Sequence, residues 1–141
     1  MSRIIKTETA GKDRTRLTRA VVAALRELTK QTEPGPEALD LAAFIALALE
    51  TIAATIDPSV AAWEKRGYWL KADRFRRDWA WSGKMGAAMR QAVLDEDWPR
   101  IAILAAQIAT RLSNVNVSPN HRMGTPWKGA YRKLKEGQNK G

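Results

Sequence analysis

The chain of 141 residues contains no cysteine and only one histidine, His121. The absence of cysteine excludes disulfides and thiolate metal sites, and nothing in the composition indicates an oxidising compartment. A catalytic constellation that needs histidine would have to use His121, which lies in a polar segment near the C-terminus. We therefore expect a protein that is not an enzyme and that binds no cofactor.

The sequence also lacks the patterns of strands, repeats and long apolar segments. No segment alternates apolar and polar residues as a strand does, and no repeat is found at any useful period. The longest uninterrupted apolar run, residues 41–49, is shorter than the ~20 residues that a membrane span needs. The N-terminus has no apolar run of the kind found in secretory signals. We expect no membrane span and a cytoplasmic location.

Basic residues are absent from one stretch and concentrated in three others. The formal net charge is +9, but residues 31–62 carry five acidic and no basic side chains. Residues 1–30 and 63–94 each carry eight basic and three acidic side chains, and residues 112–141 carry six basic and one. Clustered positive charge of this kind favours a polyanionic partner, and nucleic acid is the first candidate.

Apolar residues at helical spacing predict an all-α fold, a compact bundle of four to five helices. One helix is expected from residue 13 to about 30, and a buried central helix over residues 37–56. Asp57 and Pro58 start a third segment, for which we expect a helix that runs through Gly67 and breaks near Gly83. The last helix begins after residues 95–97 and ends near residue 114.

The predicted organisation is one helical domain, residues 13–114, between two basic and loosely structured arms, residues 1–12 and 115–141. Proline and glycine in the C-terminal arm leave little periodicity, although a short helical turn near residues 129–135 is consistent with the pattern. Arms of this composition often order only on a partner. The alternative interpretation is that they serve solubility alone.

The stretch from Trp63 to Trp81 holds four of the six tryptophans and six lysines or arginines. Large aromatic side chains are mostly buried, so we expect most of these rings to fill the core while the cations project outward. Tyr68 and Leu70 fall on the two apolar faces of the predicted helix, whereas Trp69 falls between them and is the ring expected to be exposed. Cations can neutralise phosphates, and an exposed ring can stack on an unpaired base. The stretch is thus interpreted as a core helix with a basic outer face.

The candidate nucleic-acid ligands come from this outer face, from the first helix and from the C-terminal arm. They are Arg14, Arg16, Arg19, Lys65, Arg66, Trp69, Lys71, Arg74, Arg76, Arg77, Arg122, Lys128, Arg132 and Lys133. Together they predict a nucleic-acid-binding accessory protein or a small subunit of a nucleoprotein complex, which contacts the phosphate backbone of RNA or DNA. The alternative is an adaptor between protein subunits, in which the aromatic stretch is the partner surface.

Three consecutive acids, Asp95, Glu96 and Asp97, raise the question of a metal-dependent nuclease. Side chains of adjacent residues point in different directions, so three in a row are poorly placed to share one Mg²⁺. Their position before Pro99 gives them another role, because acids stabilise the N-terminus of a helix. No metal site is predicted.

Overall fold

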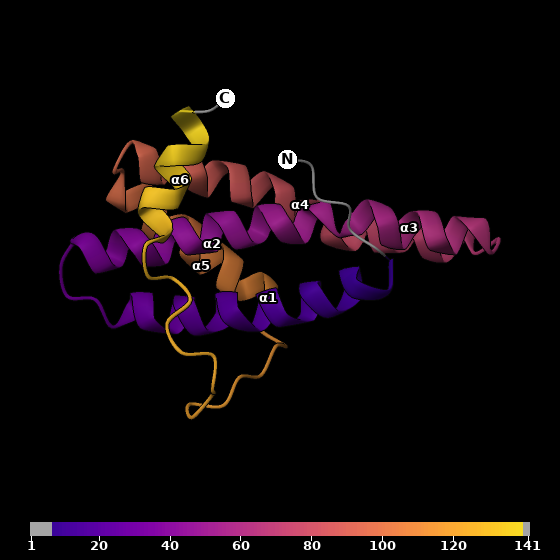
Figure 1. The fold of residues 1–141 in the computed structure, drawn as a ribbon, viewed down its shortest axis with the longest axis horizontal. Coiled ribbons are helices and arrows are strands. Elements are labelled where there is room, and N and C mark those ends of the chain that lie inside the picture. The colour runs from indigo at the N-terminus through magenta and orange to yellow at the C-terminus, as the bar shows by residue number, and fades with distance from the viewer. Residues whose placement is uncertain (1–6, 140–141) are drawn as a thin grey trace.

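A computed structural model describes residues 7–139 of the protein, and within this range it is built of helices with no strand. The helices are α1 (Thr7–Thr29), α2 (Pro36–Ala54), α3 (Ile56–Lys65), α4 (Trp69–Leu94), α5 (Trp98–Arg111) and α6 (Ala130–Asn139). Only Thr55 separates α2 from α3, so these two form one nearly continuous rod and the bundle consists of five rods (Figure 1). The prediction of an all-α bundle of four to five helices is confirmed.

Helix α2 lies at the centre of the bundle, as its sequence predicts. Leu41, Ile45 and Leu49 recur at helical spacing and are completely buried. Alanines fill most positions between them, and their small side chains let α1, α4 and α6 approach this helix closely. Burial of each leucine or isoleucine contributes roughly 1.5–3 kcal/mol, so this one helix supplies a large part of the core.

The rod formed by α2 and α3 is long and apolar enough, by length and composition alone, to cross a membrane. Its most apolar window has a mean hydropathy of 1.9, and 56% of that window is buried by the rest of the bundle. A central helix of a helical bundle has the same properties. The expectation that the chain does not span a membrane stays a prediction.

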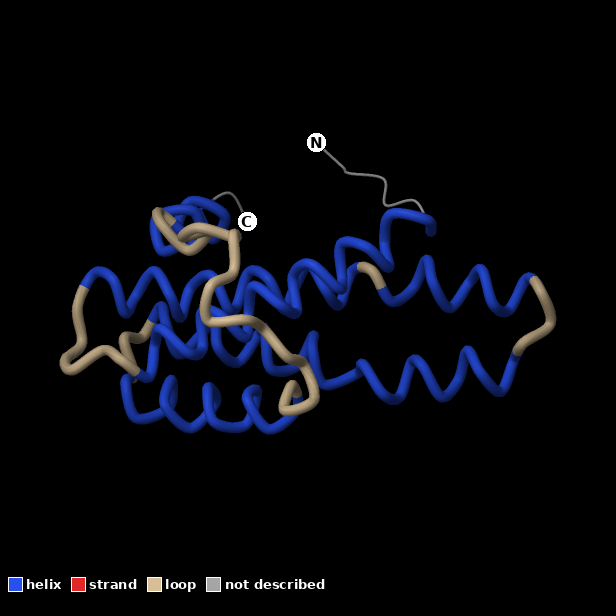
Figure 2. The backbone as a smooth tube through the Cα atoms, turned by 90° about the horizontal axis from the view of Figure 1, so that it is seen from below, coloured by secondary structure: helices blue, strands red, loops and turns tan. Residues whose placement is uncertain are grey.

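Helices α3 and α4 form a hairpin that projects from the body of the bundle (Figures 1 and 2). The chain turns at Gly67, whose φ of +84° is in the left-handed region. The Gly67 N–H donates to the Glu64 carbonyl and the Tyr68 N–H donates to the Trp63 carbonyl, each over 2.9 Å, which is the Schellman pattern at a helix C-terminus. The prediction of a helix through Gly67 is therefore wrong.

The expected break near Gly83 is wrong as well, since α4 continues through Gly83 and Gly86. A Cβ built on Gly86 would lie 3.2 Å from the Glu50 backbone nitrogen and 3.2 Å from the Leu49 Cβ. The glycine lets α4 pack directly against the backbone of α2. What favours glycine here is this close approach, and the tertiary packing of α4 offsets the helix propensity that glycine lacks.

The ends of the chain are more helical than the sequence indicates. Helix α1 begins at Thr7, within the predicted N-terminal arm, while Arg3 and Lys6 of that arm lie outside the described residues. In the C-terminal segment, Trp127 and Leu134 are 5% and 0% exposed and belong to the main core. The C-terminal segment up to residue 139 therefore packs against the bundle, where we expected a loose arm with a short helical turn.

Two side chains from distant helices hold this C-terminal segment in place. The Asp40 carboxylate accepts hydrogen bonds from the Gly129 N–H over 3.1 Å and the Tyr131 N–H over 3.0 Å, and so satisfies the free N–H groups at the start of α6. The Arg26 guanidinium donates to the Val117 carbonyl over 2.7 Å. Neither partner could be found from local sequence, because Asp40 and Arg26 lie about 90 positions away.

Candidate nucleic-acid interface

The far end of the α3–α4 hairpin carries a dense group of exposed cations. Lys65 and Arg66 close α3, Lys71 and Arg74 lie in the first turns of α4, and Arg77 follows one turn later. All five side chains are exposed. We call them the basic face of the hairpin. It coincides with the outer face that the sequence predicts for residues 65–77.

One cation of the predicted outer face, Arg76, is paired with acidic groups. Its guanidinium lies 3.4 Å from the Asp73 carboxylate and 3.7 Å from the Glu64 carboxylate. Both pairs are largely exposed to solvent, so each contributes little to stability, but together they reduce the positive charge that Arg76 offers to a phosphate. Arg76 is therefore a weaker candidate ligand than its neighbours Arg74 and Arg77.

Most rings of the hairpin point inward and hold it together. The Trp63 and Phe75 rings meet edge to face with centroids 4.8 Å apart, and they pack on Val60 in a small second core. This cluster is distinct from the main core, to which Trp81 belongs. Trp63 of α3 and Phe75 of α4 pack against each other within the hairpin, because the hairpin extends beyond the end of α2.

Trp69 is the exposed ring that the sequence predicts, with 63% of its surface accessible. Tyr68 and Leu70 beside it are 55% and 85% exposed, although sequence analysis placed both on apolar faces expected to be buried. The turn at Gly67 explains the difference, because it ends the helix whose faces were used in that assignment. We call residues 68–70 the apolar tip of the hairpin.

Arg14 does not belong to the exposed basic surface that the sequence predicts for the first helix. Its Nη1 donates to the Thr55 Oγ1 over 3.1 Å and to the Ser59 Oγ over 3.3 Å, and its guanidinium lies 4.6 Å from the Phe75 ring centroid. Burial lowers the pKa of this guanidinium. Arg14 therefore ties α1 to the base of the hairpin, and we remove it from the proposed interface.

A second group of cations lies where α1 meets the loop that precedes α6. Lys12, Arg16 and Arg19 are exposed on α1, and Arg16 and Arg19 share a shallow hollow with Met123 from that loop. Arg16 pairs with Asp13 over 3.5 Å. Arg122, next to Met123 in the chain, is exposed as well, so the fold brings predicted ligands from the two ends of the sequence together.

The remaining C-terminal candidates lie on or beside α6. Lys128 and Lys133 are exposed and line a hollow beside Leu17 of α1 and Phe44 of α2. The Arg132 Nε lies 3.1 Å from the Glu136 carboxylate, one helical turn further along. These residues are too far along the fold from the hairpin to belong to one continuous face with it (Figure 1). Sequence analysis missed Lys84, which is exposed on α4 two turns beyond Arg77.

Asp97 and His121 make local hydrogen bonds within the described part of the chain. No group of three or more histidine and acidic side chains could hold a metal ion there. The Asp97 carboxylate accepts a hydrogen bond from the Arg100 N–H over 3.2 Å, which confirms its predicted role as the cap of the next helix. The His121 Nδ1 accepts one from the Met123 N–H over 3.3 Å.

The arrangement can therefore bind an extended anion through the basic face, and it exposes one apolar tip beside that face. Such a surface can serve nucleic acid or a protein partner. Comparison of the chain with protein-family models, with curated proteins and with solved structures gives no match, so these side chains are the basis on which its function can be inferred.

Proposed function

We infer that the protein is a non-enzymatic nucleic-acid-binding accessory protein or a small subunit of a nucleoprotein complex. The observation that carries this proposal is the basic face, five exposed cations on a hairpin that projects from the bundle. A projecting arm can reach a polyanion without any rearrangement of the core. Lysine and arginine displace the counterions condensed on phosphates, which is the main source of affinity in such contacts.

The basic face is suited to backbone contact more than to base recognition. Arg74 and Arg77 lie one turn apart, about 4.5 Å along the helix, so they can reach adjacent phosphates of one strand. Sequence is read through side chains that reach base edges, and contacts to phosphates carry no such information. We therefore expect binding with little sequence preference, with the second group on Arg16, Arg19 and Arg122 as an additional contact.

A binding titration tests this function directly. Labelled RNA and DNA oligonucleotides of mixed sequence, single- and double-stranded, are titrated with the full chain at several salt concentrations and followed by fluorescence anisotropy. If several phosphates are neutralised, log K falls linearly with log[salt] with a slope of several units. Failure to bind any of these oligonucleotides at low salt contradicts the proposal.

The apolar tip favours a second candidate function, an adaptor between protein subunits. Leu70 has no ring to stack on a base, yet among the described residues it is the most exposed large apolar side chain, at 85%. Apolar side chains in this position gain most from burial against another protein. A partner contact that depends on Leu70 and survives nuclease treatment would favour this function over the first.

A further inference from the structure

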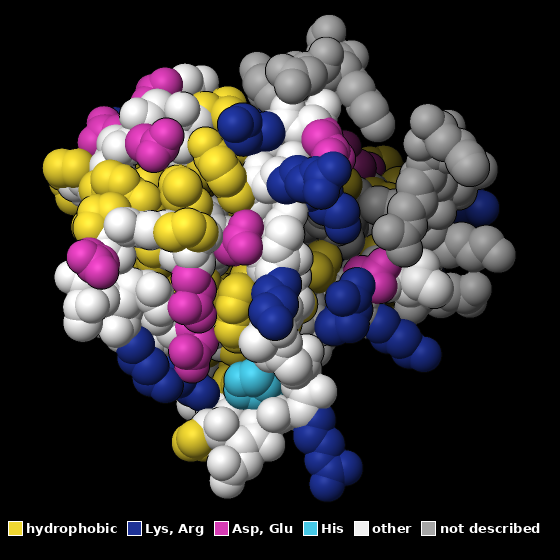
Figure 3. Space-filling view, turned by 60° about the vertical axis from the view of Figure 1, so that its left-hand side comes forward, with side chains coloured by type: hydrophobic (Ala, Val, Ile, Leu, Met, Phe, Trp, Pro, Cys, Tyr) yellow, Lys and Arg dark blue, Asp and Glu magenta, His cyan; other side chains and the backbone are white. Residues whose placement is uncertain are grey.

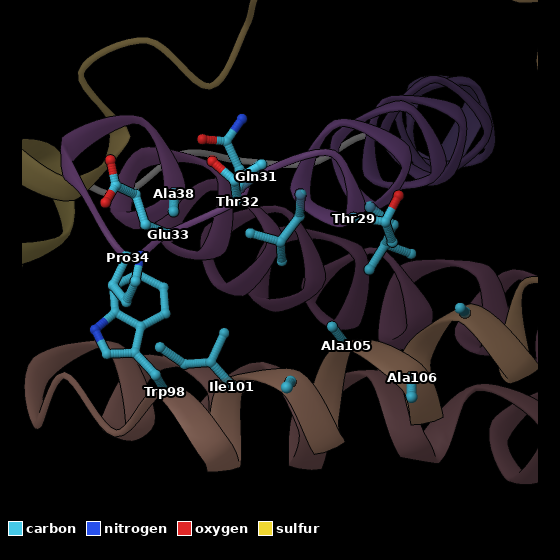
Figure 4. Close-up of a pocket in the computed structure, with 14 residues that line it drawn as sticks. Thr29, Gln31, Thr32, Glu33, Pro34, Ala38, Trp98, Ile101, Ala105 and Ala106 are labelled. Carbon is cyan, nitrogen blue, oxygen red and sulfur yellow. The ribbon is translucent and has the colours of Figure 1, made fainter.

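The end of the bundle opposite the hairpin contains an apolar groove between α1 and α5. Its volume is about 380 Å³, and its walls come from the last turn of α1, the loop that follows it and one face of α5. In Figure 4 the Trp98 ring lies beside Pro34 at one end of the groove, Ile101 points into it, and Ala105 and Ala106 line it further along. Small alanine side chains leave room on α5 for a bulky side chain from outside.

Acidic residues lie at the Trp98 end of this groove. Glu33 lines it, and Asp95, Glu96 and Asp97 immediately precede Trp98. Glu37 lies in the first turn of α2, and these acids are all exposed. Figure 3 shows this end of the molecule, where acidic side chains are scattered among and around a broad area of hydrophobic ones.

Few cations offset these acids. Lys30 is paired with Glu27 over 3.1 Å. Arg100, in the first turn of α5, is exposed and follows Asp97 closely in the sequence. Residues 31–62 contain no lysine or arginine. The groove is therefore an apolar recess with an acidic rim.

The apolar tip has the opposite properties. It is convex, consists of the consecutive side chains Tyr68, Trp69 and Leu70, and is flanked by cations such as Arg66 and Lys71. Its shape, its apolar character and the sign of its charge each complement the groove. The two cannot meet within one molecule, because the 26 residues of α4, about 39 Å of helix, lie between the tip and Trp98.

We propose that the apolar tip of one copy docks into the α1–α5 groove of a second copy. Such a contact joins two different surfaces of the same chain, so it is head-to-tail, and it repeats along a line or closes into a ring. It covers the tip and the groove at once, whereas binding of the tip to a membrane surface would leave the groove exposed. Arg77 of α4 and Lys12 and Arg19 of α1 lie outside the contact and stay exposed to phosphates.

Charge determines the conditions under which copies associate. The cations around the tip face the acids of the neighbouring groove, so association weakens as salt is added. The net charge of +9 opposes the stacking of many copies, and a polyanion bound along the basic faces would relieve that repulsion. The contact itself does not require nucleic acid, so it can be tested on protein freed of it.

Analytical ultracentrifugation of the full chain, freed of nucleic acid, tests the contact at several protein and salt concentrations. Leu70→Asp places an acid on the tip opposite the acidic rim, and Ala106→Arg fills the groove and repels the cations of the tip. Both positions are exposed, so the fold should be retained, which circular dichroism checks. We expect either change to raise the dissociation constant at least about tenfold.

Two matched variants control for charge alone. Ala87→Asp places the same acid on an exposed position of α4 away from the tip, and Ile103→Arg places the same cation on an exposed position of α5 that does not line the groove. Both should associate like the unmodified chain. Equal weakening by the control and the test variant would overturn the proposal.

Mixing the two defective variants distinguishes a head-to-tail contact from any symmetric one. Leu70→Asp retains an intact groove and Ala106→Arg retains an intact tip, so the mixture should form a one-to-one pair that cannot grow further. Failure of the folded variants to pair contradicts the proposal, as does an unmodified chain that stays monomeric at high concentration. Binding to phosphatidylserine–phosphatidylcholine vesicles that Leu70→Asp abolishes, without self-association, would assign the tip to a membrane instead.

Discussion

Glu50 of α2 and Arg90 of α4 form a two-pronged ion pair, with the Arg90 Nε 2.7 Å from Oε2 and Nη2 2.6 Å from Oε1. Each side chain is less than one-third exposed, so water screens the pair only in part. The hydrogen bonds that Arg90 donates to the Glu50 carboxylate raise the pKa of Arg90. The remaining Nη1 lies 3.4 Å from the Leu134 carbonyl of α6. One arginine therefore links the central helix to both the hairpin helix and the C-terminal helix.

Removal of one partner of this pair should destabilise the fold. Glu50→Gln leaves the Arg90 guanidinium half-buried without a carboxylate, and we expect the free energy of unfolding to fall by about 1–3 kcal/mol in urea denaturation. Arg90→Met should cost a similar amount, and the double variant less than the sum of the two. The exposed pair of Arg132 and Glu136 is the control, since Arg132→Gln should change stability by less than about 0.5 kcal/mol. Additive losses at positions 50 and 90 would contradict the coupling.

Two glycines on α4 should respond to alanine in opposite directions. A Cβ at Gly83 would lie 3.5 Å from the Ala53 Cβ, an ordinary contact, so Gly83→Ala should stabilise the protein by about 0.5–1 kcal/mol through helix propensity. A Cβ at Gly86 would lie 3.2 Å from the Glu50 backbone nitrogen, which cannot move without shifting α2. Gly86→Ala should therefore be destabilising by about 1–3 kcal/mol. Thermal and urea denaturation of the two variants would decide this, and a loss of stability in both would contradict the predicted difference.

The end of α4 offers a site at which stability can be increased. Glu96 has a φ of +48°, and the Asp97 N–H donates to the Ala92 carbonyl over 2.9 Å, so α4 ends in the same motif as α3 but without glycine. Glu96→Gly should raise the free energy of unfolding by about 0.5–1 kcal/mol, because glycine adopts this conformation without strain. Asp95→Gly serves as the control. Asp95 has a helical φ of −84°, so glycine at this position should lower the free energy of unfolding. An unchanged or lower stability of Glu96→Gly would show that the left-handed conformation carries no strain.

The helices themselves could be predicted from the sequence, but their ends could not. Leu41, Ile45 and Leu49 repeat with the period of a helix, and this local pattern is sufficient to identify a buried segment. A glycine, in contrast, has two opposite uses, to end a helix or to let another helix approach. Gly67 ends helix α3, whereas Gly86 lets α2 approach α4, and the sequence around each glycine does not show which use applies because the position of α2 is a tertiary feature.

The candidate site, like the helices, could be predicted only where a local sequence pattern determines whether a residue is exposed. Trp69 lies outside the apolar stripes of its segment, so its exposure follows from the pattern, whereas the exposure of Leu70 depends on the turn at Gly67. Arg14 looks like any other surface cation in the sequence, because its partners Thr55 and Ser59 are 41 and 45 positions away. The groove around Trp98 has no local signal at all, since it forms where α1 and α5 meet.

Arg14 should prove to be a structural residue. Arg14→Lys keeps the charge but loses the planar guanidinium beside Phe75 and part of its hydrogen bonding to Thr55 and Ser59. We expect the free energy of unfolding to fall by about 1–2 kcal/mol while the affinity for nucleic acid stays unchanged. Arg19→Lys, at an exposed position on the same helix, should alter stability by less than about 0.5 kcal/mol. If Arg14→Lys weakens nucleic-acid binding without loss of stability, the assignment of Arg14 to the interior contacts is wrong.

Three arginines of α4 and one of α6 allow the basic face to be tested with two double variants of equal net charge. Arg74→Gln with Arg77→Gln removes two cations from the basic face. Arg76→Gln with Arg132→Gln removes the same number of charges outside it, from two arginines that already pair with carboxylates. For the first pair the slope of log K against log[salt] should fall by about 1.4 on single strands and about 1.8 on duplexes, the values for two lost phosphate contacts. The second pair should change the slope by much less. Equal changes for the two pairs would mean that affinity follows net charge alone, and the basic face of the hairpin would then have no particular role in binding.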